Sequence, residues 1–365
     1  MGKKEFDLLS LGEILLRLSP PDNERIVRGD VFEKQVGGAE LNVASGVSLL
    51  GLRSGIISRI PDSSIGVFAK NKIRFCGVSD DYLVYDKSSD ARLGLYYYEN
   101  GAYPRKPGVV YDRQNSSMTK LDISEFDDSL YSSARCFHTS GITLALSQAC
   151  RETGVEMIKR FKEAGALISF DVNFRLNLWS GEEARECIEG ILPYVDIFFC
   201  SEDTARLTFG KEGNIKEIME SFAAEYPISV MASTQRTVHS PKVHSFTSMI
   251  YDAKAKKFYE EKPYENIEVV DRIGSGDAYC SGALYGLLME GGNCENALRY
   301  GNAYSAAKNT IPGDMPSLNR EEIENIIKDP ASEITKEQKE EMSNKIKCLF
   351  SCMKKGNTCS IKTKC

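Results

Sequence analysis

Short apolar runs recur along the whole chain, and segments with helical spacing separate them. The runs begin with "FDLLSLG" and "SGIISRI" and continue with "RCFHTSG", "ALISFDVNF", "VDIFFCS" and "PISVMAST". Helical patterns such as "ELNVASGVSLLGL", "IGVFAKNKIRFCG" and "GVEMIKRFKEAG" lie between them. This alternation predicts an α/β fold with a mostly parallel sheet and crossover helices. Because the strands are almost continuously apolar, helices should cover both faces of the sheet.

Two segments break this alternation, at about residues 13–36 and 90–113. Both alternate apolar residues with polar, Gly and Pro positions and have no helical pattern between them. They predict antiparallel hairpins that pair into a small sheet projecting from the main one. Such a sheet can serve as a lid over a cleft, as a dimer surface, or as both. The tyrosines of "GLYYYENG" and the "YDR" motif fit either a ligand-facing lid or an ordinary β-surface.

Bulk properties narrow the class of protein. The 365 residues carry a net charge of -6, which argues against a nucleic-acid surface. No stretch is apolar for the roughly 18 residues that a bilayer span needs, and Asp7 and Glu13 interrupt the apolar start of the chain. We therefore expect a cytoplasmic protein without nucleic-acid or membrane partners. Disulfides are not expected in that compartment.

The chain changes character near its end. From about residue 329 to 365 it becomes a charged, lysine-rich tail that contains four of the eleven cysteines. Those cysteines are Cys348, Cys352, Cys359 and Cys365. Their spacing lacks paired C-x-x-C knuckles and so does not favour a zinc site.

The stretch "DRIGSGDAYCSGALYGLL" places a glycine-rich turn directly before a predicted helix. Gly274 and Gly276 let the backbone turn tightly and approach a ligand closely. Asp277 would lie in the first helical turn, where unpaired amides and the helix dipole favour negative charge. Taken alone, this pattern fits either a capping aspartate after a loop or an anion-binding turn with a carboxylate at its rim.

Two further motifs place polar groups where ligands bind in α/β proteins. "VGGAELNVA" puts glycines at a helix entrance, either as a plain tight turn or as bare backbone open to sugar hydroxyls. "SFDVNFRLNLW" ends an apolar strand in Asp171, Asn173 and Arg175. Alternate residues of a strand share a face, so these side chains should point the same way at its carboxyl end. Ligands bind at that edge of open α/β sheets.

The sequence lacks the motifs of several enzyme classes. There is no P-loop, no early dinucleotide fingerprint, no H-E-x-x-H and no G-x-S-x-G. With only three histidines, zinc hydrolysis is also disfavoured.

The remaining motifs together resemble the ribokinase-like (PfkB) family of sugar kinases, over about residues 5–327. The late D-x-x-G-x-G-D motif, here Asp271, Gly274, Gly276 and Asp277, carries most of the resemblance. The early G-G-x-x-x-N motif supports it. The resemblance implies a three-layer α/β/α domain over residues 1–328 with a small β-sheet lid. It also implies ATP-dependent phosphorylation of a sugar hydroxyl.

The resemblance also implies roles for individual residues. Asp277 would be the general base, with the backbone amides of Gly274, Ser275, Gly276 and Asp277 as the anion hole. Substrate-binding positions would be Gly38, Asn42, Tyr96, Tyr111, Arg113, Arg175, Asp277 and Asp314. Nucleotide-binding positions would be Asn173, Arg175, Ser233, Thr234, Gln235, Arg236, Gly274, Gly276 and Asn302.

Within the family, "DVNFRLNLW", "YDR" and "TIPGD" are most similar to 2-keto-3-deoxygluconate kinases, which form the 6-phosphate. Such a substrate carries a carboxylate that Arg113 and Arg175 would clamp through charge-assisted bonds. A fructokinase or another neutral-sugar kinase is the alternative within the family. A non-catalytic regulator that binds sugar or nucleotide is the alternative outside it.

The chain departs from the family pattern at two places. Ser201 and Thr204 stand where the family often has N-x-x-E, a motif linked to magnesium, so no metal ligand is assigned. "STQRTVHSPKV", with Arg236, replaces the usual glycine-bearing nucleotide loop. The resemblance implies ATP and Mg²⁺ as cofactors and leaves a monovalent cation open. It also implies a homodimer or larger homo-oligomer formed through the lid.

Overall fold

The computed structural model describes residues 4–329. The chain divides into two units, Met1–Ile323 and Glu324–Cys365. Of the second unit the structure describes only residues 324–329, which include the end of helix α11 (Arg320–Lys328). The predicted tail at 329–365, with its four cysteines, lies outside the described residues apart from Asp329.

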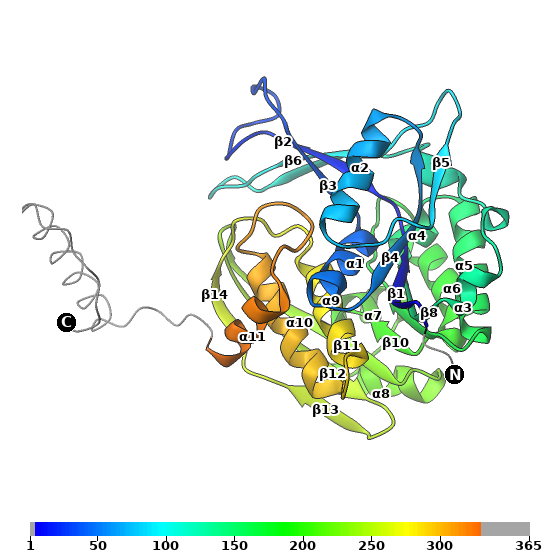
Figure 1. The fold of residues 1–365 in the computed structure, drawn as a ribbon. Coiled ribbons are helices and arrows are strands. Elements are labelled where there is room, and N and C mark those ends of the chain that lie inside the picture. Colours follow the sequence, from blue (N-terminus) through cyan, green and yellow to red (C-terminus); the bar gives the residue numbers. More distant parts are fainter. Residues whose placement is uncertain (1–3, 330–365) are drawn as a thin grey trace, which may run out of the picture. The chain divides into compact units, whose positions relative to one another are not determined.

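A ten-stranded sheet forms the centre of the first unit (Figure 1). Its strands lie in the order β13-β12-β11-β10-β9-β8-β1-β4-β5, and β14 pairs with β12. The pairs from β11 through β5 are parallel, whereas β12 runs antiparallel to β11, β13 and β14. The strands are β1 (Phe6–Leu11), β4 (Ser54–Pro61), β5 (Leu83–Asp86), β8 (Ala134–Ser140), β9 (Leu167–Asp171), β10 (Ile197–Phe199), β11 (Val230–Ser240), β12 (Val243–Asp252), β13 (Lys257–Glu260) and β14 (Tyr264–Glu268).

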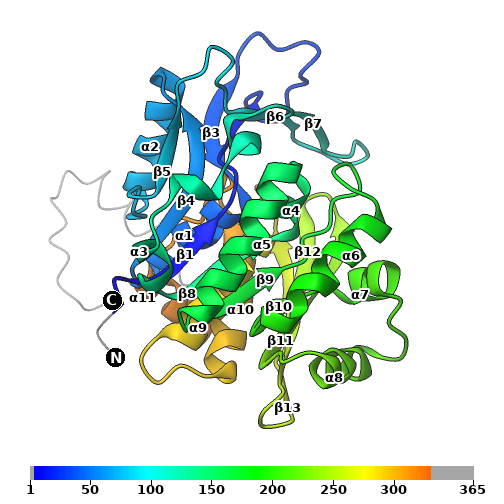
Figure 2. The same cartoon turned by 90° about the vertical axis from the view of Figure 1, so that its right-hand side faces the viewer.

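Helices cover both faces of this sheet (Figure 2), as the apolar strands predict. One face packs against α3 (Ser129–Ser132), α4 (Gly141–Ala145), α5 (Gln148–Glu163), α6 (Gly181–Ile191), α7 (Glu202–Phe209) and α8 (Ile215–Glu225). The other packs against α1 (Ala39–Leu49), α2 (Ser64–Phe75), α9 (Ser275–Leu288) and α10 (Cys294–Lys308). Short 3-10 turns are η1 (Ser117–Lys120), η2 (Ile123–Glu125) and η3 (Leu192–Tyr194). The three-layer α/β/α arrangement is therefore confirmed.

A separate four-stranded sheet, hereafter the lid, lies at the top of Figure 1, beside α2. Its order is β3-β2-β6-β7, with bounds β2 (Leu15–Ser19), β3 (Glu33–Gly37), β6 (Gly94–Glu99) and β7 (Gly108–Asp112). β2 with β3 and β6 with β7 are antiparallel, as predicted for the two irregular segments. The two hairpins join through a parallel pairing of β2 with β6.

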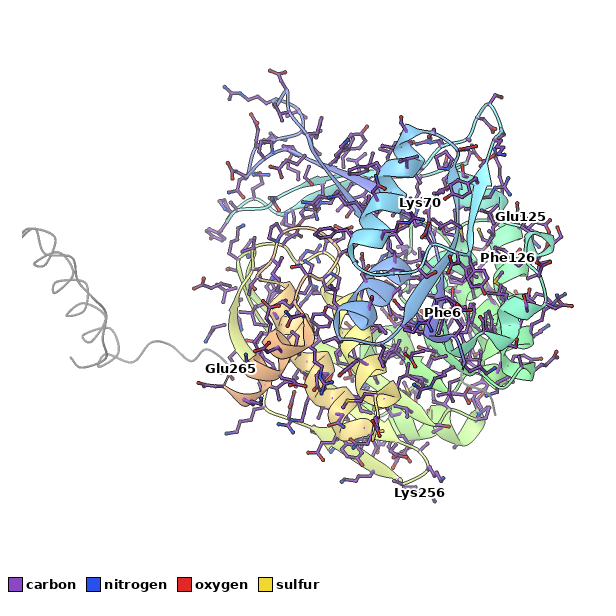
Figure 3. All side chains as sticks on the ribbon, viewed as in Figure 1. Phe6, Lys70, Glu125, Phe126, Lys256 and Glu265 are labelled. Carbon is purple, nitrogen blue, oxygen red and sulfur yellow. The ribbon has the colours of Figure 1, made fainter. Side chains whose placement is uncertain are left out.

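The sequence of the expected nucleotide loop, "STQRTVHSPKV", forms extended structure instead. Residues 233–240 continue β11, and a tight turn leads into β12. Lys256 marks the next turn, between β12 and β13, and is labelled in Figure 3. Apolar side chains at alternate positions of β12, such as Phe246 and Ile250, pack against the α9 face and hold this antiparallel edge in place. Among the described helices, none is long and apolar enough to span a membrane.

Candidate active site

A cavity of about 360 Å³ lies between the lid and the carboxyl ends of the central strands. Most of the predicted site residues line it. They are Gly38, Asn42, Tyr96, Tyr111, Arg113, Asn173, Arg175, Arg236, Gly274, Ser275, Gly276, Asp277 and Asp314. These residues come from positions far apart in the chain, so the fold brings together groups that were singled out separately.

The turn before α9 exposes backbone amides to this cavity. Gly274 has φ of 80°, and a Cβ there would lie 2.0 Å from the carbonyl oxygen of Asp314, so only glycine fits. The first i→i−4 bond of α9 runs from Ala278 N to Gly274 O. Within residues 4–329, the amides of Gly274, Gly276 and Asp277 donate no hydrogen bond. The Ser275 amide differs, because it donates to the Arg272 carbonyl at 3.3 Å.

Asp277 lies in the first turn of α9 with part of its carboxyl group open to the cavity. The Asn42 side chain donates from Nδ2 to Asp277 Oδ2 at 2.7 Å. Burial raises the pKa of Asp277 to about 6, against the lowering effects of Asn42 and Arg175. Its other oxygen has no hydrogen-bond donor among the described residues. The group is therefore ionised above about pH 6 with one oxygen available.

A second carboxyl group, Asp171 at the end of β9, lines the same cavity. Its Oδ1 accepts from the Asn173 amide at 3.1 Å, and the Cys280 thiol lies 3.9 Å from Oδ2. Burial, followed by the charge of Asp277, raises the pKa of Asp171 to about 7. The two carboxyl groups thus influence each other's protonation.

The strand-alternation argument for Asp171, Asn173 and Arg175 is wrong, although its conclusion holds. β9 ends at Asp171, and Asn173 has φ of 35°, outside any strand. The chain turns there, held by the bond from the Asn173 amide to Asp171. All three residues line the cavity because of this turn and not because of a shared strand face.

On the lid side, the charges are already paired. Arg113 is buried and donates from Nε to Glu13 Oε2 at 2.9 Å, with a second bond from Nη2 to the same oxygen. The Ser116 hydroxyl donates to the other Glu13 oxygen. Asp314 is also buried, and it accepts from Arg17 at 2.8 Å and from the Tyr96 hydroxyl.

On the opposite side, three cavity arginines have no acidic partner. Arg175, Arg236 and Arg272 form no ion pair within 4.0 Å with any acid of the described chain. Arg175 is exposed and bonds only to the Phe174 carbonyl, at 3.1 Å. Burial, and then the charge of Arg272, lowers the pKa of Arg236, so these two guanidinium groups lie near each other. Unpaired arginines beside open amides suit a polyanion such as a phosphate chain.

A second cavity of about 340 Å³ continues from this side, with Arg236 in the wall of both. Ser233, Thr234 and Gln235 line it together with Ser201, Glu202 and Asp203. Asn302 lines neither cavity, because its amide group is taken by Ser248 and Glu261 at 2.7 Å each. A direct ligand contact by Asn302 does not fit this arrangement.

Ser201 and Thr204 have a structural role here. Ser201 caps α7, accepting from the Thr204 amide at 3.2 Å, and its hydroxyl donates to Thr204 Oγ1 at 2.9 Å. No group of three or more metal-binding side chains occurs within the described 4–329 range.

Among the lining or neighbouring residues that were not predicted, four are ionisable: Glu13, Arg17, Glu40 and Arg272. Glu13 and Arg17 are ionisable side chains inside the apolar run "GEILLRL", and that contrast is a usable signal. Glu40 is fully buried and accepts from Ser140 at 2.6 Å and from Thr143 at 2.7 Å. Its position in the first turn of α1 gives no hint of those partners.

The chain is similar to kinases of known sequence and structure. A 2-dehydro-3-deoxygalactonokinase from Haloferax volcanii is 34% identical over 322 residues, covering 88% of this chain and 96% of its own. The structure of 2-dehydro-3-deoxygluconokinase from Thermotoga maritima is 33% identical with a TM-score of 0.83, covering 88% and 99%. A ribokinase-type E. coli chain in complex with ATP and Mg²⁺ shares the fold, at 21% identity, a TM-score of 0.76, and 88% and 99% coverage.

The model of the pfkB family of carbohydrate kinases matches residues 5–321. That range holds the whole main sheet, the lid and both cavities. Kinases of this family use ATP as the phosphoryl donor. The chain belongs to the PfkB family of carbohydrate kinases.

Proposed function

We propose that this kinase transfers the γ-phosphoryl group of ATP to the 6-hydroxyl of a 2-keto-3-deoxy sugar acid, with 2-keto-3-deoxygluconate as the first candidate. One observation carries the proposal: Asp277 and the open amides beside it face a cavity whose other wall is the lid. The names of the Haloferax volcanii and Thermotoga maritima relatives support the sugar-acid class and differ in the sugar's configuration.

Asp277 is the general base in this proposal. Asn42 occupies Oδ2, which leaves Oδ1 free to accept the proton of the attacking hydroxyl. The pKa of about 6 keeps the group ionised near neutral pH while it remains basic enough to take a proton.

The anion hole consists of the amides of Gly274, Gly276 and Asp277. They sit at the N-terminus of α9, where the helix dipole adds to their attraction for charge on the transferred phosphoryl group. Ser275 contributes less than the sequence predicts, because its amide already donates to Arg272. Arg236 and Arg272 bind the phosphate chain, and the second cavity receives the rest of the nucleotide.

Mg²⁺ that arrives on ATP needs only one or two protein carboxylates, since phosphates and waters supply its other ligands. Asp171 fits this need, because it lines the cavity beside Asp277 and forms no ion pair within the described chain. When bound, the ion neutralises phosphate charge.

The substrate's carboxylate is assigned to Arg175, not to Arg113. Arg175 has a free guanidinium group at the cavity wall, whereas the charge of Arg113 is already balanced by Glu13. Arg113, Tyr96 and Tyr111 then contact hydroxyl or keto oxygens from the lid side.

An ADP-release assay tests the proposal across 2-keto-3-deoxygluconate, 2-keto-3-deoxygalactonate, fructose, ribose and adenosine. Turnover should be highest on one of the two keto-deoxy acids and strongly reduced in Asp277→Asn. Preference for fructose would replace the sugar acid with a neutral sugar. Binding of sugar or ATP without any turnover would identify a regulator instead.

We further propose that the protein works in the cytoplasm as a homo-oligomer built through the lid. The lid strand β7 is exposed along its whole length, including Val109 and Val110. The described cysteines are all free, which suits a reducing compartment. Light scattering of Val110→Lys should show a smaller particle than the wild type, whereas an unchanged mass would exclude this face.

A further inference from the structure

Arg17, on lid strand β2, is buried at 3% side-chain exposure and touches groups outside the lid. Its Nη1 lies 2.7 Å from Asp271 Oδ2 and 2.8 Å from Asp314 Oδ1. Its Nε donates to Ser19 at 2.8 Å, and its guanidinium lies 4.4 Å from the centre of the Tyr98 ring. One side chain thus bridges two carboxylates that belong to the loops on either side of the α9–α10 helix pair.

Both carboxylates shape the turn that holds the open amides. Asp271 Oδ1 accepts from the Ile273 amide at 3.0 Å, and Oδ2 accepts from the Gly313 amide at 3.1 Å. The carbonyl of Asp314 packs against Gly274 so closely that a Cβ would not fit. A shift of either carboxylate would therefore move the backbone from 273 to 277.

The buried charges of Arg17, Asp271 and Asp314 stabilise one another. Asp271 and Asp314 are both buried, and Arg17 is the one cation that forms ion pairs with them within residues 4–329. Lys308 is buried nearby but donates to the backbone carbonyls of Asp271 and Ile311, at 3.4 and 3.1 Å. Removing the guanidinium would leave two buried carboxylates without an ion-pair partner.

We propose that Arg17 is a positioning residue that couples the lid to the anion-binding turn. Sugar that contacts Tyr96 and Tyr111 orders β6 and β7, and β6 pairs with β2, which carries Arg17. An ordered lid holds Arg17 in place, and Arg17 holds Asp271 and Asp314. These two residues then fix the turn that carries the amides of Gly274 and Gly276. The inference rests on the proposed function and adds that sugar and ATP bind cooperatively through this contact.

Arg17→Met and Arg17→Lys test the coupling, with Arg59→Met as the matched control. Arg59 also pairs with two acids, Asp86 and Glu125, but lies outside both cavities; Glu125 is labelled in Figure 3. Affinity for a non-hydrolysable ATP analogue is measured with and without 2-keto-3-deoxygluconate, alongside kcat, KM and thermal stability. Lysine offers a point charge without the planar fork, so it should restore part of the effect.

In the wild type, sugar should tighten binding of the ATP analogue. In Arg17→Met that ratio should fall to about one, and kcat should drop about 10²-fold, the loss typical of misplaced catalytic groups. Arg59→Met should lose stability and keep the coupling ratio. Equal coupling in Arg17→Met and Arg59→Met, or no coupling in the wild type, would overturn the inference. Absence of wild-type turnover on every sugar would instead contradict the proposed function.

Discussion

The two walls of the cavity treat positive charge in opposite ways. On the lid wall, Arg17 and Arg113 are buried, and each pairs with a carboxylate of this chain. On the wall made by the turn before α9 and the loop after β9, Arg175, Arg236 and Arg272 have no acidic partner within 4.0 Å in the described residues. Charge that is already balanced fixes geometry, whereas charge that is not balanced is free to bind an anion.

The two walls therefore have different roles: one positions the sugar, and the other attracts anionic groups. The lid wall holds hydroxyl groups in place around the sugar, and its ion pairs keep that arrangement rigid. The turn wall supplies both amides and cations to the transferred phosphoryl group and to the substrate's carboxylate. The following predictions test whether the division is as sharp as the contacts indicate.

The largest expected effect belongs to Asp277. Asp277→Asn keeps the bond to Asn42 within reach but removes the base, so kcat should fall by about 10²-fold or more. KM for the sugar should change little, because the shape of the turn is retained. Near-normal turnover in a steady-state assay would reduce Asp277 to a helix-capping role.

Arg113→Ala should mainly lower stability. It leaves Glu13 buried without its cation, and breaking such a pair costs about 3 kcal/mol. Denaturant unfolding measures this loss, and the double variant with Glu13→Gln should recover much of it. If kcat/KM on the sugar acid falls far more than on a neutral sugar, Arg113 binds the carboxylate and the lid wall is not neutral.

Arg175→Ala should show the reverse pattern. Stability should hardly change, because the side chain is exposed and bonds only to the Phe174 carbonyl. A lost charge-assisted contact of about 1.5–3 kcal/mol should lower kcat/KM about ten- to a hundredfold. A drop in melting temperature as large as that of Arg113→Ala would show that the two walls do not differ.

The value of kcat/KM should decrease at acid pH, with an apparent pKa near 6 that belongs to Asp277. Asp171, Glu40 and Asp314 face this group as acids, and Arg175 and Lys308 as cations. Because the pKa of Asp171 is about 7, this residue is mostly protonated while Asp277 titrates, so Asp171→Asn should leave the acid limb near pH 6. A limb that moves to lower pH would mean that Asp171 already carries its charge when Asp277 titrates.

The last expected effect concerns how the stability of the protein depends on pH. The pKa of Asp171 is raised by burial to about 7 in the folded state, above its value of about 3.9 in an unfolded chain. The contribution of Asp171 to stability is therefore lost as pH rises from about 4 to 7, the range in which the folded form holds the extra proton. Asp171→Asn should melt higher than the wild type at pH 8, and the two should converge near pH 4.

Regular parts of the fold were predictable because their signals are local. The apolar period and the glycines at 38 and 274 mark α1, α9 and the strands between them, and the two irregular segments mark the lid. The parallel pairing of β2 with β6 joins segments far apart in the chain, and no local pattern specifies it.

The sequence predicted which residues form the site but not which side chains contact one another. Sequence motifs identified the residues around Asp277, yet they could not show that Glu13 balances Arg113 or that Asn302 turns away to Ser248 and Glu261. Such contacts depend on which distant side chains meet after folding. The loop after β9 was assigned for the wrong reason, because one positive φ at Asn173 redirects the chain.

The ion pair between Arg17 and Asp314 also sets an order of events during synthesis. The two residues are 297 positions apart, and at about 5–20 residues per second the ribosome needs tens of seconds to span them. Until then β2 can pair with neighbouring strands, but its guanidinium lacks Asp314, and it also lacks Asp271 until that residue is made. It stays in water over that time, because burying it without its partners is too costly. β2 is thus the first lid strand to be made and the last to complete its ion pairs. A nascent chain that stops short of residue 314 has a lid without the Arg17–Asp314 ion pair.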